Sequence, residues 1–262
     1  MKKDMQGLLV NIIVGIIIFI LNVKKGKKFF NKEFWKYALG FNIPLLAYYL
    51  SQVIFNQSDR IMISHITSTS DAAMYGVAYN LAMILTFVLN AINGSYVPWL
   101  YGKIKKNNAQ DNKSISLILI MLMGLIILCV IWYAPEIILI MAGKQYSVAI
   151  YVVAPVSMSL LLLFYSQLFI NIEFYYEEKK MLVYGSIGAA VLNIILNGLL
   201  IPIFGFVAAG YTTLISYIVF ALSNYYTMRL MLKKRKLDDD MYDYKLLLLL
   251  FVAFMISGFL GV

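Results

Sequence analysis

The chain alternates long apolar stretches with short polar connections. Eight stretches approach or reach the length of about 20 apolar residues that crosses a bilayer, and they run over 6–23, 37–56, 75–99, 115–134, 148–172, 181–201, 206–228 and 245–262. Their apolar residues are continuous, whereas the strands of a membrane barrel alternate with period two. Pro202 and Gly205 predict a tight hairpin between the sixth and seventh stretches. The pattern therefore predicts an all-α, polytopic membrane bundle of about eight transmembrane helices.

Composition points the same way. Hydrophobic residues make up 62% of the 262 residues and charged residues 13%, whereas a soluble domain is nearer half apolar and a quarter charged. A soluble enzyme, a disordered chain and a nucleic-acid-binding domain are therefore disfavoured. The net charge of +9 does not indicate a nucleic-acid partner, because the basic residues form short blocks between apolar stretches.

The distribution of positive charge predicts the orientation. Eighteen of the 22 lysines and arginines lie on alternate connections, and the opposite side holds only Lys2, Lys3, Arg60 and Lys144. Cytoplasmic connections carry the excess of Lys and Arg, so Met1 is expected outside. The first stretch is followed by lysines without a small-residue cleavage site, so we interpret it as a retained helix rather than a signal peptide. Earlier spans would explain a basic start outside, and we therefore expect the chain to be part of a longer protein.

Groups for covalent chemistry are sparse. The chain has one cysteine, Cys129, one histidine, His65, and no Walker A motif. These residues indicate no catalytic site, metal or cofactor, so we expect a protein that is not an enzyme. All 13 acidic residues lie in connections or near the ends of spans. Ion-driven pumps commonly use a carboxylate at mid-membrane, so this placement argues mildly against ion coupling.

Neutral polar side chains are spread through the spans. An amide that faces lipid would lack a partner, at a cost of several kcal/mol, so these side chains face other helices or a wet cavity. They either form hydrogen bonds between helices or line a cavity that binds sugar hydroxyls. The candidates are Asn42, Gln52, Asn56, Asn90, Asn93, Asn193 and Asn197.

The sharpest local feature is the neighbouring pair Asp59 and Arg60. It lies at the outer end of a span, and the apolar run Ile61–Ile66 continues beyond it. Charges in such a place are costly unless they are paired or solvated. One interpretation is a structural ion pair or helix cap. The other is that Arg60 contacts an anionic group such as phosphate, which guanidinium binds through two parallel hydrogen bonds.

Four segments carry a family resemblance. They are 34–45 (FWKYALGFNIPL), 58–64 (SDRIMIS), 70–81 (SDAAMYGVAYNL) and 93–101 (NGSYVPWLY). Their order and spacing resemble the second half of bacterial polysaccharide-biosynthesis exporters, the O-antigen and capsule repeat-unit flippases of the multidrug/oligosaccharidyl-lipid/polysaccharide exporter superfamily. The similarity is densest over 34–101 and continues as a pattern of spans to about 228.

The resemblance implies a fold of two six-helix bundles around a central cavity, of which this chain would supply one. Residues 1–23 would be the last helix of a missing N-terminal bundle, and 24–36 a basic cytoplasmic loop with an interfacial helix. Residues 37–228 would form the six-helix C-terminal bundle, 229–244 a charged cytoplasmic loop, and 245–262 an additional helix. One bundle cannot enclose the cavity, so either the chain is a fragment, as we expect, or two copies associate.

The function implied by the resemblance is transport without covalent change. The chain would move undecaprenyl-diphosphate-linked oligosaccharide to the outer leaflet of the bacterial cytoplasmic membrane by alternating access. Its partners would be that substrate, membrane lipids, and the missing bundle or a second copy. Arg60, Asp59 and the span amides would line or gate the route. The alternatives are a cation-coupled drug exporter of the same superfamily, a lipid II flippase, a membrane glycan polymerase or ligase, and a nonfunctional remnant.

Overall fold

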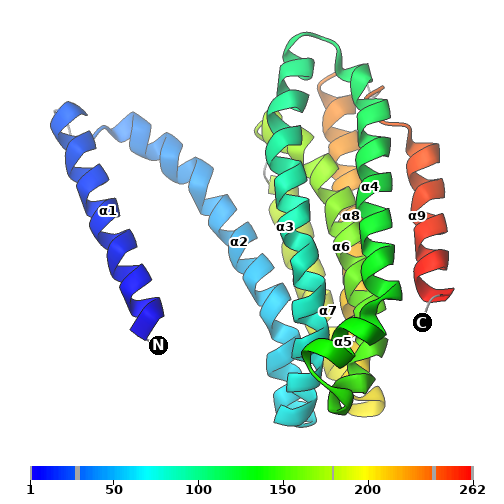
Figure 1. Ribbon diagram of the computed structural model, residues 1–262. Coiled ribbons are helices and arrows are strands. Elements are labelled where there is room, and N and C mark those ends of the chain that lie inside the picture. Colours follow the sequence, from blue (N-terminus) through cyan, green and yellow to red (C-terminus); the bar gives the residue numbers. More distant parts are fainter. Residues whose placement is uncertain (1, 27–29, 179, 238–239, 261–262) are drawn as a thin grey trace. The chain divides into compact units, whose positions relative to one another are not determined.

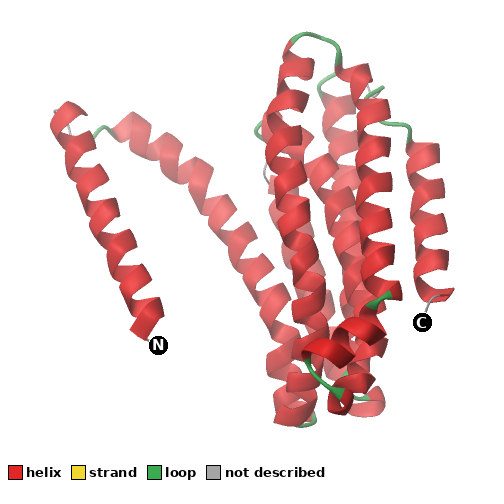
Figure 2. Ribbon diagram, viewed as in Figure 1, coloured by secondary structure: helices red, strands yellow, loops and turns green. Residues whose placement is uncertain are grey.

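The computed structural model describes residues 2–26, 30–178, 180–237 and 240–260 (Figure 1). Within these ranges all regular structure is helical (Figure 2). The α-helices are α1 (Lys2–Gly26), α2 (Lys32–Ile66), α3 (Thr69–Lys105), α4 (Asn112–Trp132), α5 (Ala134–Met141), α6 (Ile150–Tyr175), α7 (Lys180–Phe204), α8 (Val207–Lys234) and α9 (Tyr244–Leu260). Two short 3₁₀ helices, η1 (Ala109–Asp111) and η2 (Lys144–Ala149), precede α4 and α6.

The predicted fold class, a polytopic helical bundle, is confirmed. Among the described residues, six helical segments are long and apolar enough to cross a membrane, and they correspond to α2, α3, α4, α6, α7 and α8. Helix α9 is apolar but shorter, at 17 residues. Each of the eight predicted stretches falls largely within one observed helix. The chain is therefore a multi-pass membrane protein.

The chain divides into two compact units, Met1–Pro44 and Leu45–Val262. The first contains α1 and the beginning of α2, and its described apolar side chains between Ile12 and Leu21 are exposed. Helix α2 starts at Lys32 and continues without a break through the residues expected to form a separate interfacial helix. The division of the chain into a last helix of a missing bundle, a basic loop, a six-helix bundle, a charged loop and an additional helix stays a prediction.

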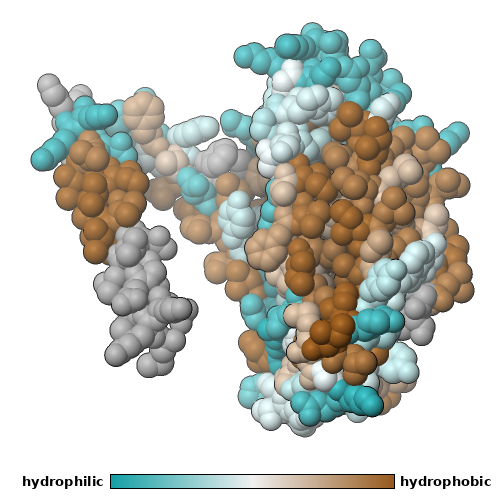
Figure 3. Space-filling view, in the orientation of Figure 1, coloured by the Kyte–Doolittle hydropathy of each residue, from teal (hydrophilic) through white to brown (hydrophobic). Residues whose placement is uncertain are grey.

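In the second unit the helices pack around α6. Helix α6 is buried along most of its length, from Val152 to Glu173, and it packs on α3, α4 and α8. Helix α7 packs on α8. The largest buried side chains include Tyr75, Phe164 and Phe220. An apolar surface remains around the middle of the bundle, while its two ends are hydrophilic (Figure 3), as expected for a bundle surrounded by lipid.

The connections of this unit separate into two ends (Figure 1). The α3–α4 and α8–α9 connections lie together at the end rich in lysine and arginine, which we call the basic end. Lys103 pairs with Asp111 there at 2.6 Å, and Lys113 pairs with Asp240. The α2–α3 turn, α5 and the α7–α8 turn lie at the opposite end. This alternation is the one that the charge pattern predicts, with the basic end cytoplasmic.

The predicted hairpin between α7 and α8 is present, although its proline has a different role. Helix α7 runs through Pro202 to Phe204, and α8 begins at Val207. Gly205 makes the turn with a φ of 72°, a left-handed conformation that favours glycine. Of the two residues that predicted the hairpin, only Gly205 lies in the turn, and Pro202 lies within α7.

Candidate functional site

A buried polar cluster surrounds Asp59, whose side chain is 1% exposed. The Tyr75 hydroxyl of α3 donates to Asp59 Oδ2 at 2.5 Å, and the Thr213 hydroxyl of α8 donates to the same oxygen at 2.7 Å. The Asn197 amide of α7 donates to Oδ1 at 2.6 Å. One carboxylate of α2 is therefore held by donors from three other helices, which compensates for its removal from water.

Further hydrogen bonds extend this cluster between α2, α7 and α8. The Ser58 hydroxyl donates to Asn193 Oδ1 at 3.0 Å, and Asn197 Nδ2 donates to the same oxygen at 3.2 Å. Asn193 Nδ2 donates to the Thr213 hydroxyl at 3.3 Å, and the Thr212 hydroxyl donates to Asn197. Asn193 and Asn197 are both fully buried, so they act as links between helices, the first of the two roles that the sequence left open.

The ion pair considered between Asp59 and Arg60 does not form among the described residues. Neighbouring residues of a helix point in directions about 100° apart, so Arg60 leaves the cluster and crosses to α3. Its Nη2 donates to Asn80 Oδ1 at 2.8 Å and to the Gly76 carbonyl at 3.5 Å. Its guanidinium carbon lies 4.8 Å from the centre of the Tyr79 ring. The guanidinium is thus held between α2 and α3, and its Nε is buried without a hydrogen-bond partner in the described structure.

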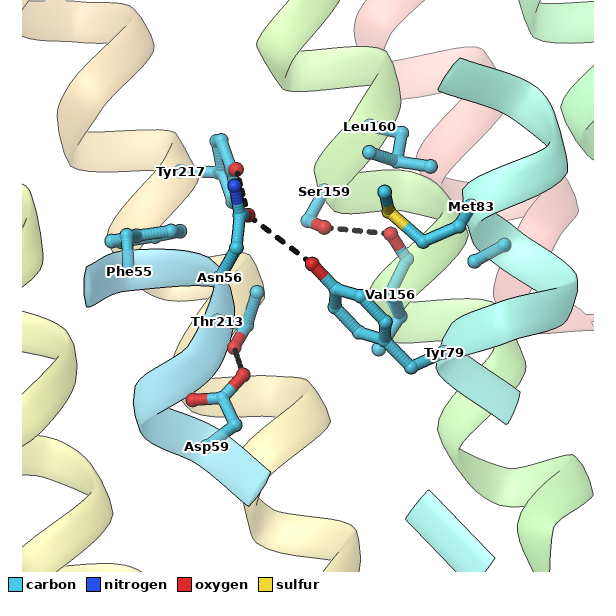
Figure 4. Close-up of a pocket in the computed structure, with 11 residues that line it drawn as sticks. Phe55, Asn56, Asp59, Tyr79, Met83, Val156, Ser159, Leu160, Thr213 and Tyr217 are labelled. Atoms are coloured by element: carbon cyan, nitrogen blue, oxygen red, sulfur yellow. Dashed lines mark hydrogen bonds between the residues drawn. The ribbon is translucent and has the colours of Figure 1, made fainter. Parts of the chain in front are cut away.

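A small pocket opens beside Asp59 between α2, α3, α6 and α8 (Figure 4). Its polar wall includes Asn56, Asp59 and Ser159, and Val156 and Leu160 contribute apolar surface. The Tyr79 hydroxyl donates to Asn56 Oδ1 at 3.2 Å. The pocket therefore joins the Asp59 cluster to the face of α2 that carries Asn56.

A second buried polar group lies toward the basic end. Glu173 of α6 is 1% exposed, and the Thr227 hydroxyl of α8 donates to its Oε1. Two residues earlier on α6, Asn171 donates to Asn93 Oδ1 of α3 at 2.9 Å. Asn93 is therefore another predicted amide that links helices.

The remaining candidates lie apart from these clusters. Asn42 belongs to the first unit, is exposed, and donates to the Ala38 carbonyl of its own helix. Asn90 is exposed on α3, and Gln52 is half-buried on α2. Gln52, Asn56 and Arg60 recur every four residues, so they share one face of α2.

Sequence reasoning missed the hydroxyl partners and the burial of two acids. Tyr75, Thr213 and Thr227 resemble ordinary span residues, and only the packing shows that their hydroxyls reach carboxylates. Asp59 and Glu173 lie near the ends of their helices in sequence, yet both are buried. The mild argument against ion coupling is therefore weakened, because a buried carboxylate lies inside a candidate span.

The sequence is similar to that of known polysaccharide biosynthesis proteins. The sequence model of the polysaccharide biosynthesis protein family matches residues 5–102. A Haemophilus influenzae protein of the Lsg locus is 26% identical over 207 residues, which are 74% of this chain and 50% of that protein. A second protein of the same organism, a membrane protein, is 26% identical over 114 residues, 42% of this chain and 28% of its own length. The chain thus spans half or less of these relatives.

A solved structure shares the fold. It is an outward-facing multidrug resistance transporter of the MATE family in the MOP superfamily. The TM-score is 0.60 at 19% sequence identity, and the match covers 84% of this chain and 51% of that one. The family match, the relatives and this fold confirm the resemblance stated from the sequence: the chain is similar to polysaccharide biosynthesis proteins and has the fold of a membrane exporter.

Proposed function

We propose that the chain forms part of a flippase that moves undecaprenyl-diphosphate-linked oligosaccharide across the bacterial cytoplasmic membrane. The polysaccharide biosynthesis match and the transporter fold support this substrate class and this kind of activity. The physical task is to carry a sugar and diphosphate head group past hydrocarbon, where its polar groups would lose hydration. A polar path that shields the head while the lipid tail stays in the bilayer meets this need.

The observation that carries the proposal is Arg60. A cationic side chain in a membrane helix costs about 2.5–3.5 kcal/mol by insertion scales, and Arg60 is only half-buried. Asn80 and the Tyr79 ring orient its guanidinium. Guanidinium pairs with phosphate through two parallel hydrogen bonds, so Arg60 would receive the diphosphate. Asn56, one turn earlier on the same face, would meet the first sugar hydroxyls.

Transport would need a second bundle. The chain spans half of the exporter with which it shares a fold, and alternating access moves one bundle against another around a central site. The partner bundle would come from the remainder of a longer protein or from a second copy of this chain. The Asp59 cluster would keep α2, α3, α7 and α8 moving together as one body.

The test uses a strain that lacks the gene. We expect lipid-linked oligosaccharide to accumulate on the cytoplasmic leaflet, and wild-type protein to clear it. Arg60→Ala should fail to clear it at equal expression, whereas Arg60→Lys, which keeps the charge but not the planar donor geometry, should clear it partly. Lys144→Ala is the matched control, because it removes an exposed cation at the same end of the bundle. Absence of accumulation would overturn the proposal, and full activity of Arg60→Ala would remove Arg60 from the route.

A second candidate is a cation-coupled drug exporter. Asp59 favours it, because ion-driven transporters use buried intramembrane acids and Asp59 is buried within a candidate span. Such a protein would expel cationic drugs only while an ion gradient exists, and its loss would leave lipid-linked oligosaccharide unchanged. An essential gene would instead indicate a lipid II flippase, and covalent turnover of lipid-linked glycan in detergent would indicate a polymerase or ligase.

A further inference from the structure

An apolar groove lies between α6, α8 and α9, outside the Asp59 and Arg60 region. Its volume is about 430 Å³, and it is open to the surroundings. Phe169 of α6, Ala221 and Leu222 of α8, and Leu248 and Phe251 of α9 line it. Three apolar helices line it, and most of its surface comes from apolar side chains, so it suits a hydrocarbon chain.

The way α9 packs explains why the groove stays open. Helix α9 packs on α4 and α6 and lies beside α4 at the edge of the bundle (Figure 1). Two glycines allow this close approach: Gly124 of α4 faces the Phe254 ring, and Gly258 of α9 faces Met158 of α6. Because α9 packs mainly on α4, it leaves the surface of α6 between α9 and α8 uncovered.

The groove ends in aromatic rings and cations at the basic end. The rings of Tyr225 and Tyr244 lie 5.3 Å apart, and both line the groove together with Lys245. The Arg229 guanidinium lies 5.8 Å from the centre of the Tyr225 ring and 5.1 Å from that of Tyr244. Arg229 also lines an adjoining depression together with Lys233. An apolar slot therefore leads directly into a group of three basic side chains.

We propose that this groove binds one anionic phospholipid of the leaflet at the basic end. An acyl chain would occupy the slot between α8 and α9, and the phosphate would lie against Arg229 and Lys245. The charge favours this occupant, because basic pockets between membrane helices attract anionic head groups and each Lys or Arg near the surface contributes about 1 kcal/mol. The tyrosines at the mouth fit the level of the lipid head groups, where aromatic rings gather. The inference is independent of the transported substrate.

The experiment counts lipids on the full-length protein. Protein purified in detergent is mixed with phosphatidylglycerol or phosphatidylcholine, and native mass spectrometry measures the bound fraction. We expect phosphatidylglycerol to bind in preference to phosphatidylcholine. Since 1 kcal/mol is about a fivefold change in affinity, the double variant R229Q/K245Q should bind it about 25-fold more weakly. Ala221→Trp, which fills the slot and keeps the charge, should also lose the lipid. K105Q/K106Q removes two exposed cations at the same end and should bind normally.

Melting curves confirm that each variant is folded before its binding is compared. Loss of phosphatidylglycerol in both groove variants, with normal binding in the control, supports the proposal. Equal binding of the two phospholipids, or normal binding by R229Q/K245Q and Ala221→Trp, overturns it. Binding of a polyprenyl phosphate in preference to phosphatidylglycerol would assign the groove to the tail of a transported lipid. A dimer that Ala221→Trp dissociates would assign it to a second copy of the chain. Either result would also overturn the proposal.

Discussion

Replacing Asp59 tests whether the buried cluster holds the bundle together. In Asp59→Ala, the donors from Tyr75, Thr213 and Asn197 lose their common acceptor. Hydrogen bonds between membrane helices contribute about 0.6 kcal/mol each on average, so three of them give a loss of about 2 kcal/mol. Orphaned buried donors cost about 1–3 kcal/mol each, but Asn197 keeps a bond to Asn193. We therefore expect Asp59→Ala to lower the free energy of unfolding by about 2–4 kcal/mol.

Asp59→Asn separates the shape of the side chain from its charge. The new amide oxygen can accept from Asn197, and the new NH₂ can donate to the hydroxyls of Tyr75 and Thr213, because a hydroxyl both donates and accepts. The loss should therefore stay near 1 kcal/mol. If Asp59 is only a structural link, this variant will fold and transport. If its charge takes part in coupling, the variant will fold and fail to transport.

The measurement is reversible unfolding in mixed micelles, with transport scored in the deletion strain. Glu136→Ala serves as the matched control, because it removes an acid that is exposed in the first turn of α5. Its unfolding free energy should change by less than about 1 kcal/mol, the usual range for a charge near a helix terminus. Asp59→Ala as stable as the wild type would refute the role assigned to the cluster.

Three further predictions concern other parts of the chain. Gly124→Ala would place a Cβ 2.3 Å from the Phe254 ring, so it should destabilise the docking of α9 by about 1–3 kcal/mol, measured by unfolding, while Gly188→Ala, with nothing within 4 Å, should not. Arg60→Lys should retain less transport than wild type but more than Arg60→Ala, measured by clearance of lipid-linked oligosaccharide. Burial raises the pKa of the Tyr242 hydroxyl well above its ordinary value of 10.0, so the unfolded chain loses this proton first and stability falls as pH rises above 10. Tyr242→Phe should reduce that fall in alkaline unfolding curves.

Much of the fold could be predicted because a membrane helix requires a continuous apolar run of about 20 residues, which is visible in the sequence. A run of apolar residues such as 115–134 has few alternatives once water is excluded, since every backbone group must be satisfied within the helix. The alternating basic connections likewise predicted which ends of the second unit lie together. The stop at Gly205 could not be separated from Pro202 by sequence, because membrane helices tolerate proline where freed backbone groups find other partners. Nor could the sequence show that α9 would pack on α4, which depends on two glycines and the side chains opposite them, Phe254 and Met158.

The candidate polar residues named from the sequence form two groups, one fully buried and one half-buried. Only the tertiary contacts distinguish them. Asn193 and Asn197 are fully buried and satisfy one another and Asp59, so a sugar could reach them only if the helices separated. Asn56 and Arg60 lie one turn apart on α2 and are half-buried. Asn56 accepts from Tyr79 of α3 and Tyr217 of α8, and Arg60 donates to Asn80 of α3. Periodicity finds both groups, because each repeats every four residues. Periodicity does not show that Asp59 points into the cluster shared by four helices, whereas the neighbouring Arg60 points about 100° away and donates to Asn80 of α3. The position that needs hydrogen-bond partners for stability and the position that offers a charge to a ligand are therefore adjacent in sequence, and substitutions at the two should fail in different assays.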